Sequence, residues 1–407
     1  ARPGGGSFVS DVARPASRSV AARRDVAREP RGAIGGRASA PTARDPARDF
    51  RLGVPDVSAL DWAVWRRLSA RALRAFARQP AGYAAAQGQP ALREGIAHHV
   101  SFARAVSCGS DDVLVTAGAQ QAFDLVARTL VKPGRTVVAV EAPGYPPARA
   151  AFAAAGATVV PVRVDAEGLV VDELPPQARI VYVTPAHQFP LGCVLSARRR
   201  AALIDFACAH RAAIVEDDYD GEFRFDGRPH DALKTIDRSE AVFFVGTFSK
   251  SLFPGLRLGY VVPPPWALEA LIERKRQADS HCNVPAQDTL AAFIEQGHLA
   301  RHVRRMRRVY ASRRSLLQAA LQTPELARWL EPVAGTSGLH LAALARSRRD
   351  VDALVADARR ASVGVYSLDE YRHGLRAPHG LLFGYGAIGD AAIEDGMQRL
   401  RRVLRQR

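Results

Sequence analysis

From Phe50 onward, apolar residues recur either at the helical spacing of about 3.6 residues or in short runs of strand length. We predict helices at residues 59–78, 91–102, 120–130, 146–155 and 197–210, and strands at 113–116, 136–140, 158–162, 180–184, 212–216 and 241–246. Strands and helices that alternate through short connections are typical of a mostly parallel sheet with helices on both faces. The pattern therefore predicts an α/β protein whose ligand site lies at the carboxyl ends of the strands.

After Trp266 the pattern becomes mostly helical. A long arginine-rich stretch from His298 to Leu321 leads into mixed α and β segments and a final helix at residues 391–403. We predict a large domain at residues 50–265, followed at residues 266–407 by a helical segment and a smaller α+β lobe.

The first 49 residues lack this periodicity. Residues 14–48 are mainly Ala, Arg, Pro, Ser and Gly, and they cannot bury enough apolar surface to offset the entropy of ordering. We predict a flexible linker at residues 10–49, which is either a basic tether for a polyanion or a solvated spacer. The chain starts with Ala1 and lacks the apolar segment of a secretory signal, so we expect part of a longer reading frame or a processed chain.

Composition excludes several classes of protein. The chain has 407 residues, of which 47% are hydrophobic and 24% charged, as in globular proteins and unlike disordered or fibrous ones. No apolar run approaches the roughly 18 residues of a membrane-spanning helix. The four cysteines are far apart and form no C-x-x-C pair, so we expect thiols in a reducing cytoplasm and no metal site.

The net charge of +16 comes almost entirely from arginine, because only four of the 57 basic residues are lysines. An excess of Arg and Ala is typical of GC-rich coding sequence. The charge therefore favours attraction of anions in general and indicates DNA only weakly.

The segment with the most chemical information follows the strand at residues 241–246. It reads T-F-S-K-S-L-F-P-G-L-R-L-G over residues 247–259 and contains one of the four lysines. Lys250 offers an amine nucleophile, Thr247 and Ser249 offer hydroxyls, and Arg257 offers a forked cation. An amine can form a Schiff base with an aldehyde, and the hydroxyls and the guanidinium can bind a phosphate group next to it. The alternative is a surface loop with a stray lysine, but a string of this length rarely arises by chance.

A carboxylate is predicted at the end of a buried strand. The strand at residues 212–216 runs into Asp217-Asp218-Tyr219-Asp220, and acidic residues avoid such positions unless they are paired. Pyridoxal phosphate (PLP) would supply a partner, because a carboxylate keeps its ring nitrogen protonated and the pyridinium acts as an electron sink. We predict this role for Asp217 and a hydrogen bond from Tyr219 to the ring hydroxyl. A calcium loop is the alternative, but the glycine and the later glutamate are not found at the offsets that such a loop needs.

Two further turns after strands could bind an anion or a planar cofactor. Residues 116–121 form a strand-to-helix turn of small residues that would place the amides of Ala119 and Gln120 at a helix N-terminus, where anions bind. Tyr145 follows another strand and could stack on a planar cofactor. Each feature alone is equally compatible with ordinary packing or a surface tyrosine.

Together these segments resemble a known family. The set G-A-Q-Q, E-x-P-x-Y, T-P-A-H-Q-F-P-x-G, E-D-D-Y-D and T-F-S-K-S-x-x-P-G-L-R is similar to fold type I PLP-dependent transferases of the aspartate aminotransferase group. The H-Q-F-P and E-D-D-Y-D forms resemble the MocR subfamily of GntR transcriptional regulators, in which such a domain follows a winged helix-turn-helix. The resemblance runs from about Phe50 to the end.

The resemblance implies roles for individual residues. Lys250 would form the internal aldimine, Asp217 would pair with the pyridinium, Tyr219 would contact the phenolate oxygen and Tyr145 would stack on the ring. The phosphate cup would be formed by Ala119, Gln120, Thr247, Ser249 and Arg257. Tyr83 would reach the phosphate of a neighbouring subunit, which implies a homodimer with shared sites, and His187 would contact the cofactor from its loop.

The resemblance also extends to the N-terminus. Gly4-Gly5-Gly6-Ser7-Phe8-Val9 resembles the wing that closes a GntR-type DNA-binding domain. We therefore expect residues 1–9 to be the remnant of a winged helix-turn-helix that is mostly absent from this chain.

One feature departs from the enzymes of the group. They carry an arginine in a C-terminal strand that holds the substrate carboxylate, whereas this chain has Leu382 at that position. Arg372 and Arg376 lie nearby in the sequence and are candidates to replace it.

The leading hypothesis is a PLP-binding effector domain of a MocR-type regulator, which senses an amino compound through aldimine exchange at Lys250. The alternative is an active class I/II aminotransferase, and a dimer that has lost PLP is disfavoured because the polar set is intact. Whether the chain is an enzyme stays open.

Overall fold

The fold is described from a computed structural model that covers residues 48–79, 82–225, 231–335, 337–347, 351–374 and 378–406. The predicted wing at residues 1–9 and residues 10–47 of the predicted linker lie outside this part of the chain. No described helix is long and apolar enough to cross a membrane.

A mixed eight-stranded sheet forms the centre of the described chain, with the order β1-β8-β7-β6-β5-β2-β3-β4. Strands β7, β6, β5, β2 and β3 are parallel, whereas β8 is antiparallel to both β1 and β7, and β4 is antiparallel to β3. The strands are β1 (Leu114–Thr116), β2 (Val137–Ala142), β3 (Thr158–Asp165), β4 (Gly168–Leu169), β5 (Ala178–Val183), β6 (Ala213–Asp218), β7 (Val242–Thr247) and β8 (Gly259–Val262).

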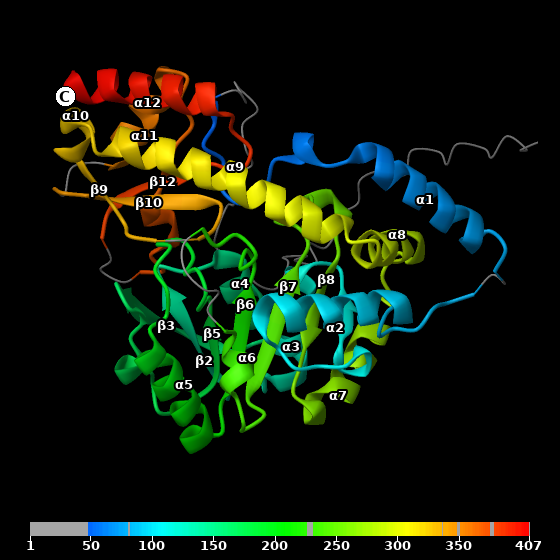
Figure 1. Ribbon diagram of the computed structural model, residues 1–407. Helices are drawn as coiled ribbons and strands as arrows, with labels where there is room; N and C mark the ends of the chain where they lie inside the picture. The colour runs from blue at the N-terminus through cyan, green and yellow to red at the C-terminus, as the bar shows by residue number, and fades with distance from the viewer. Residues whose placement is uncertain are drawn as a thin grey trace, which may run out of the picture. The chain divides into compact units, whose positions relative to one another are not determined.

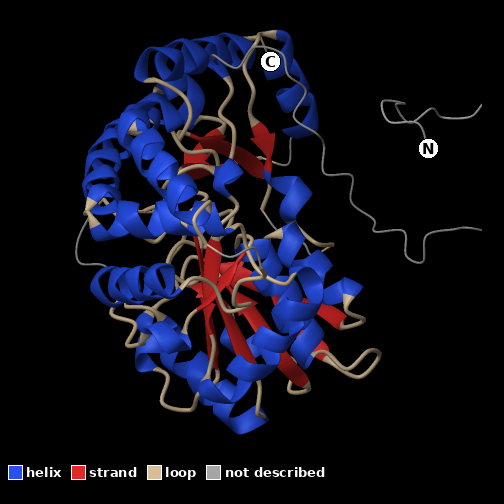
Figure 2. Ribbon diagram, turned by 90° about the vertical axis from the view of Figure 1, so that its right-hand side faces the viewer, coloured by secondary structure: helices blue, strands red, loops and turns tan. Residues whose placement is uncertain are grey.

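Helices cover both faces of this sheet (Figure 2). Because side chains alternate along a strand, Val215 and Phe243 pack into one apolar cluster with residues of α3 and α7, whereas Ile214 and Val242 pack into another with α5. The helices that connect the strands are α3 (Ala119–Leu130), α4 (Pro146–Ala154), α5 (Ala197–His210) and the short α6 (Leu233–Ile236).

Four more helices pack beside the sheet. They are α1 (Trp62–Phe76), α2 (Pro90–Arg104), α7 (Pro265–Asp279) and α8 (Val284–Glu295). Helix α7 contacts α3, while α8 contacts α1 and α2. Side chains cap the starts of two of them: Asp61 accepts from the amide of Val64 at α1, and Asn283 accepts from that of Ala286 at α8.

The C-terminal lobe contains a four-stranded antiparallel sheet with the order β11-β12-β10-β9. The long helix α9 runs from the region of α8 to this lobe (Figure 1). Phe50 also joins the lobe, where its ring packs edge-on against Phe383. The elements are α9 (His298–Leu321), α10 (Pro324–Ala327), β9 (Leu330–Pro332), β10 (His340–Ala345), α11 (Val351–Arg360), β11 (Tyr366–Ser367), β12 (Gly380–Gly384) and α12 (Asp390–Arg405).

All eleven helices and strands predicted between residues 59 and 246 are present, with boundaries shifted by a few residues. The predicted α/β class is confirmed. The end of the predicted linker differs from expectation, because Asp49 forms a β-bridge with Gly364 and the guanidinium of Arg48 pairs with Asp395. These two residues are therefore attached to the C-terminal lobe.

Candidate cofactor site

The predicted site residues lie at the carboxyl ends of four neighbouring parallel strands. Tyr145 follows β2, His187 follows β5, Tyr219 follows β6 and Lys250 follows β7. Because carboxyl ends of parallel strands share one edge of the sheet, residues from four distant segments are brought together there.

Asp217 lies near the end of β6 and is 4% exposed. Its Oδ2 accepts a hydrogen bond from the hydroxyl of Tyr182 at 2.6 Å, whereas its buried Oδ1 has no hydrogen-bond partner within the described residues. Burial raises the pKa of Asp217 to about 7, although the bond from Tyr182 opposes this shift. An unpaired buried carboxylate oxygen is costly, and a cationic N–H donor would satisfy it.

The neighbouring carboxylate has a different environment. Oδ2 of Asp218 lies 2.8 Å from the guanidinium Nε of Arg104, and both side chains are buried. Asp218 therefore has its countercharge within the protein, although its Oδ1, like that of Asp217, has no hydrogen-bond partner among the described residues. The countercharge distinguishes the two, because no ion pair joins Asp217 to a cationic side chain in the described part of the chain.

Lys250 follows β7 and is half-buried. Its Nζ donates a hydrogen bond of 2.6 Å to the carbonyl oxygen of Gly53. Glycine is needed there, because a Cβ added to Gly53 would lie only 2.8 Å from Nζ of Lys250. Burial lowers the pKa of Lys250, and the charge of Arg257 acts in the same direction. A lowered pKa increases the neutral, nucleophilic fraction of the amine.

The N-terminus of α3 and a guanidinium lie side by side. Gly118 precedes the helix with a φ of +81°, no side chain caps the helix, and Ala119 and Gln120 provide its first amides. Arg257 donates a hydrogen bond of 2.7 Å to the carbonyl of Ala117, and a Cβ on Gly118 would lie 3.0 Å from its Nη2. Free helix amides beside a guanidinium form a binding site for a phosphate-like anion.

Two hydroxyl side chains lie at the end of β7: Thr247 is its last residue, and Ser249 follows it. The Oγ1 of Thr247 donates to the Oγ of Ser249 at 3.1 Å, and the amide of Ser249 donates to Thr247 Oγ1 at 3.2 Å. The two side chains thus form one local turn on the Lys250 segment.

His187 lies in the interior and contacts Tyr219 and Asp220. Its Nδ1 is 2.9 Å from both the Tyr219 hydroxyl oxygen and Asp220 Oδ2. Because an ionised carboxylate only accepts, Nδ1 carries the proton and shares it with both oxygens. The Tyr219 oxygen then accepts from His187, and its own proton can be donated elsewhere.

His340 packs on this group, with its ring centroid 4.7 Å from that of His187. Its Nε2 donates to the carbonyl of Pro190 at 3.0 Å. The ligand atoms of His187, Asp220 and His340 lie within 4.8 Å of one another, and all three side chains are buried. Hydrogen bonds already use a nitrogen of each imidazole, so the cluster has the character of a buried polar network.

The two remaining predicted tyrosines differ in environment. Tyr145 is half-buried, its ring packs edge-on against Phe189 at 5.4 Å, and burial raises its pKa to about 12. Tyr83 is 90% exposed and lies next to the ring of His281, and no hydrogen bond or ring contact joins it to another candidate site residue within the described chain.

The positions expected to hold a substrate carboxylate offer no free guanidinium among the described residues. Leu382 is fully buried in β12 within an apolar cluster that includes Leu191 and Ala342. Nη1 of Arg372 lies 3.4 Å from Oδ1 of Asp369, and Asp369 also bonds His379 at 2.9 Å. Arg376 lies outside the described residues.

Several site residues were missed at the sequence level. Tyr182, which bonds Asp217, is one of them. The others form a buried network at the neighbouring loops. In it, Oε2 of Glu141 accepts from the hydroxyl of Thr184 at 2.5 Å, and the side-chain amide of Gln188 donates to the carbonyl of Pro143 at 2.8 Å. The only signal was a polar residue in an apolar strand, namely tyrosine at position 182 and glutamate at position 141.

Comparisons with known proteins agree with this geometry. The family model for aminotransferase class I and II matches residues 58–347. The chain is 34% identical over 407 residues to the probable rhizopine catabolism regulatory protein MocR of Rhizobium meliloti, covering 98% of this chain and 82% of that protein. It is 33% identical to the HTH-type pyridoxine biosynthesis transcriptional regulator PdxR of Corynebacterium glutamicum, covering 84% and 73% of the two chains.

Solved structures show the same fold. A kynurenine aminotransferase of Pyrococcus horikoshii in complex with PMP superposes with a TM-score of 0.81 at 25% identity, covering 89% of this chain and 92% of that one. The α-aminoadipate aminotransferase LysN of Thermus thermophilus, complexed with N-(5′-phosphopyridoxyl)-L-leucine, gives 0.80 at 26% identity, covering 88% and 92%. The chain therefore belongs to the aminotransferase class I and II family and is a member of its MocR/GntR-type transcriptional regulators.

Proposed function

We propose that this chain is the PLP-binding effector domain of a transcriptional regulator and that it senses an amino compound at Lys250. The observation that carries the proposal is the buried, unpartnered Oδ1 of Asp217 at the carboxyl end of β6. A protonated pyridine nitrogen is the kind of donor that this oxygen lacks.

The remaining residues fit the other groups of PLP. The neutral amine of Lys250 would attach to its aldehyde carbon, and the amides of Ala119 and Gln120, the hydroxyls of Thr247 and Ser249 and the guanidinium of Arg257 would hold its phosphate. Tyr219 would donate to the ring oxygen, and Tyr145 would pack on the ring. When bound, PLP supplies an electron sink for carbanion chemistry.

We propose sensing of an amino compound, and not its turnover, because the described site offers no free arginine to hold a substrate carboxylate. Leu382 is apolar and buried where the enzymes have arginine, and Arg372 is engaged with Asp369. Exchange of an amine onto the cofactor needs only Lys250 and a fitted pocket, whereas rapid turnover also needs a clamped carboxylate. A bound amine alters DNA affinity only if it binds one conformation of the regulator more tightly than the other.

In this proposal residues 1–9 end a DNA-binding domain and residues 10–49 link it to the effector domain at residues 50–265 and 266–407. DNA is the expected partner because relatives such as PdxR are HTH-type regulators. The effector domain would form a homodimer in which Tyr83 reaches the phosphate site of a second copy.

An active aminotransferase is the second candidate. The chain is 30% identical to aromatic-amino-acid aminotransferase 1 of Thermococcus litoralis, covering 70% of each chain. The Lys250 and Asp217 positions needed for proton transfer are also intact.

One assay separates the two candidates. PLP-loaded protein is mixed with a panel of amino acids and amines plus a keto-acid acceptor, and both the visible spectrum and the product are followed. The regulator proposal expects spectral changes with few or no turnovers, whereas several turnovers per second on any common amino acid would make the enzyme the better assignment.

Attachment to Lys250 is tested on the same preparation. After borohydride reduction, the wild-type protein and Lys132→Ala, an exposed-lysine control, should carry cofactor on the Lys250 peptide. Lys250→Ala should carry none, and labelling at another lysine in the wild type would overturn the assignment.

A further inference from the structure

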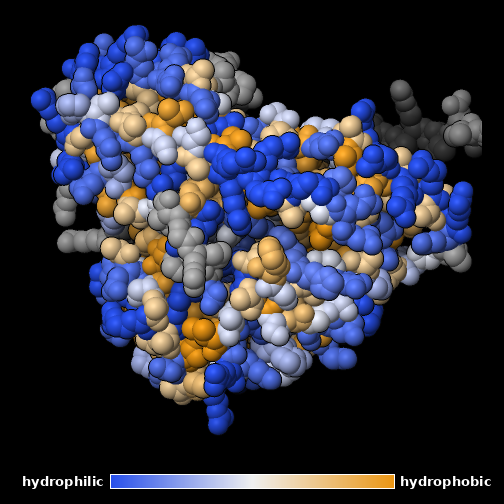
Figure 3. All heavy atoms as spheres, viewed as in Figure 1, coloured by the Kyte–Doolittle hydropathy of each residue, from blue (hydrophilic) through white to orange (hydrophobic). Residues whose placement is uncertain are grey.

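Helix α9 has an unusual charge distribution. It contains seven arginines and no aspartate or glutamate in 24 residues. One face is buried through residues such as Met306, Tyr310 and Arg313, and the guanidinium of Arg313 is paired with Asp56 at 2.6 Å. Figure 3 shows strongly hydrophilic side chains gathered over this helix.

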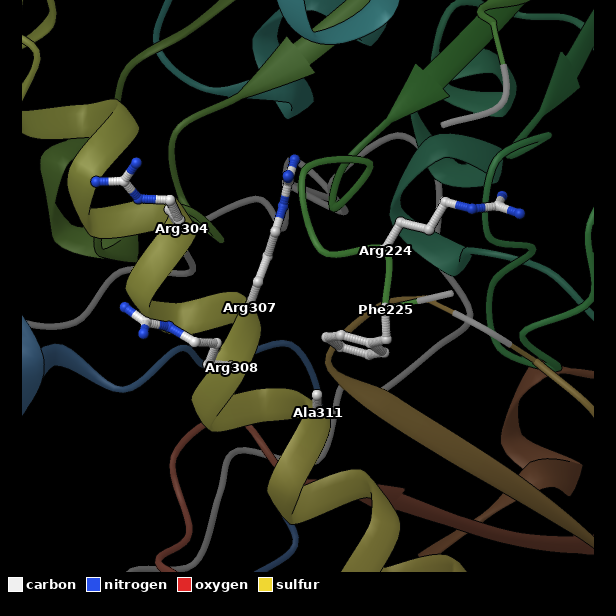
Figure 4. Close-up of a pocket in the computed structure, with 6 residues that line it drawn as sticks. All are labelled: Arg224, Phe225, Arg304, Arg307, Arg308 and Ala311. Carbon is white, nitrogen blue, oxygen red and sulfur yellow. The ribbon is translucent and has the colours of Figure 1, made fainter. Parts of the chain in front are cut away.

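The outer arginines border a hollow in the surface with a volume of about 640 Å³. It is lined by Arg304, Arg307, Arg308 and Ala311 of α9 and by Arg224 and Phe225 from the segment after β6. Figure 4 shows Arg304 and Arg308 extending from the same side of the helix, Arg307 reaching toward the loop, and the Phe225 ring lying opposite Ala311.

Three arginines of α9 at this hollow are joined to no carboxylate of the described chain. No acidic residue is among its described lining residues, and no ion pair joins Arg304, Arg307 or Arg308 to a described carboxylate. Arg307 is held in place by a hydrogen bond from its Nε to the carbonyl of Glu222. Arg304 and Arg308 are exposed and lie one turn apart, so both guanidiniums are available for a ligand.

The hollow also has an apolar wall. Phe225 is half-buried against the core, and the guanidinium of Arg314 lies 6.0 Å from its ring centroid. A volume of this size lies within the range of small-molecule sites, roughly 300–1,000 Å³. A solvated basic helix face explains the charge, but it does not explain an open hollow with an aromatic wall.

We propose that this hollow binds a ligand with several phosphate groups. Guanidiniums bind phosphate oxygens through paired, charge-assisted hydrogen bonds, and two exposed guanidiniums without an ion pair to a described carboxylate, those of Arg304 and Arg308, attract a multiply charged anion. None of its lining residues belongs to the candidate cofactor site, and the proposal does not rest on the function proposed above.

Inorganic tripolyphosphate is the direct probe, titrated by calorimetry at low salt into PLP-loaded protein. Loading occupies the cofactor's phosphate cup, and the visible spectrum reports it separately. We expect binding that weakens at least tenfold in the double variant Arg304→Gln/Arg308→Gln. The control is Arg67→Gln/Arg71→Gln, which removes the same charge from exposed positions of α1 at the same spacing, and its affinity should change less than twofold.

Two further ligands identify the source of the phosphates. A nucleoside triphosphate tests for a free organic phosphate, and a duplex of arbitrary sequence tests for a nucleic-acid backbone. Selective loss in the α9 variant with either ligand supports the site and names its source. Absence of tripolyphosphate binding, or equal losses in both double variants, would overturn the proposal even if PLP loading is normal.

Discussion

The carboxyl of Asp217 couples the candidate site to folding at the scale of one residue. Its pKa is raised by burial to about 7, so the folded protein holds a proton that the unfolded chain loses near pH 4. The cofactor-free protein should therefore lose stability as pH rises from about 4 to 7, by an amount on the order of 3 kcal/mol.

The substitution Asp217→Asn tests this directly. It removes the buried charge, so cofactor-free Asp217→Asn should be more stable than wild type at pH 8 and equal to it at pH 4. PLP affinity should fall at least tenfold, because the ring nitrogen loses its counterion. Denaturant melts at both pH values and a PLP titration measure these effects, and Asp205→Asn on the exposed side of α5 serves as control. Loss of PLP binding in Asp218→Asn instead would assign the role to the neighbouring carboxyl.

His187 is expected to act through Tyr219. The imidazole shares its Nδ1 proton with Tyr219 and Asp220, which directs the tyrosine proton toward the cofactor pocket. His187→Phe should let Tyr219 donate to Asp220 instead and should raise the pH midpoint of the bound cofactor's visible band, because its anionic oxygen loses a donor. A spectroscopic pH titration measures the midpoint.

The matched control is His379→Phe, which removes another imidazole bonded to an aspartate, Asp369, in the C-terminal lobe. An unchanged midpoint in His187→Phe, or the same shift in both variants, would show that His187 serves packing alone.

The sequence points to candidate site residues whose proposed role follows from their chemical type in a local motif. Lys250, Thr247 and Arg257 belong to one string, and Asp217 stands out as a carboxylate after an apolar strand. Tyr182 could not be predicted, because its contact with Asp217 depends on the pairing of β5 with β6. The position of His187 behind Tyr219 likewise depends on how two loops pack.

At the scale of elements, the turn into α3 requires glycine. Gly118 has a φ of +81°, and a Cβ there would lie 3.0 Å from the guanidinium of Arg257. Gly118→Ala should therefore both strain the backbone and displace Arg257, which lowers PLP affinity about tenfold as well as stability. Gly134→Ala isolates the first effect, because Gly134 has a φ of +70° with no atom within 4 Å of the added Cβ. Equal PLP affinities in the two variants would show that the approach of Arg257 does not matter.

The elements differ in how well the sequence predicts them. Strands β5, β6 and β7 are buried on both faces, so they appear as continuous apolar runs. Strand β8 is not among the predicted elements, because its four residues follow the proline- and glycine-containing Lys250 segment. The small-lobe strands β9 and β11 have two or three residues each, too few for a periodic signal.

At the scale of the whole molecule, exposed apolar residues near the start of the described chain are candidates for the interface of the proposed homodimer. Tyr83 is 90% exposed, and Leu73 and Phe76 at the end of α1 are 56% and 44% exposed. Large apolar side chains are exposed at interfaces before the partner binds, and they make this segment a candidate for one. If Tyr83 donates to the phosphate of a second subunit, Tyr83→Phe should weaken PLP binding about tenfold through loss of a hydrogen bond to a charged group.

Complementation between two variants with impaired PLP binding tests whether the site is shared. In a heterodimer of Lys250→Ala and Tyr83→Phe, one site combines an intact Lys250 with an intact Tyr83 from the other subunit, while the second site lacks both. An equal mixture after subunit exchange should therefore regain high PLP affinity at about a quarter of its sites, as random pairing in a twofold dimer dictates. If Tyr83 acted within its own subunit, neither site of the heterodimer would hold both groups, and mixing would restore nothing. Each variant differs from wild type at one residue, and mixing does not change either chain. Recovery of high PLP affinity on mixing therefore cannot come from improved folding, and it reports which subunit supplies Tyr83 to each site.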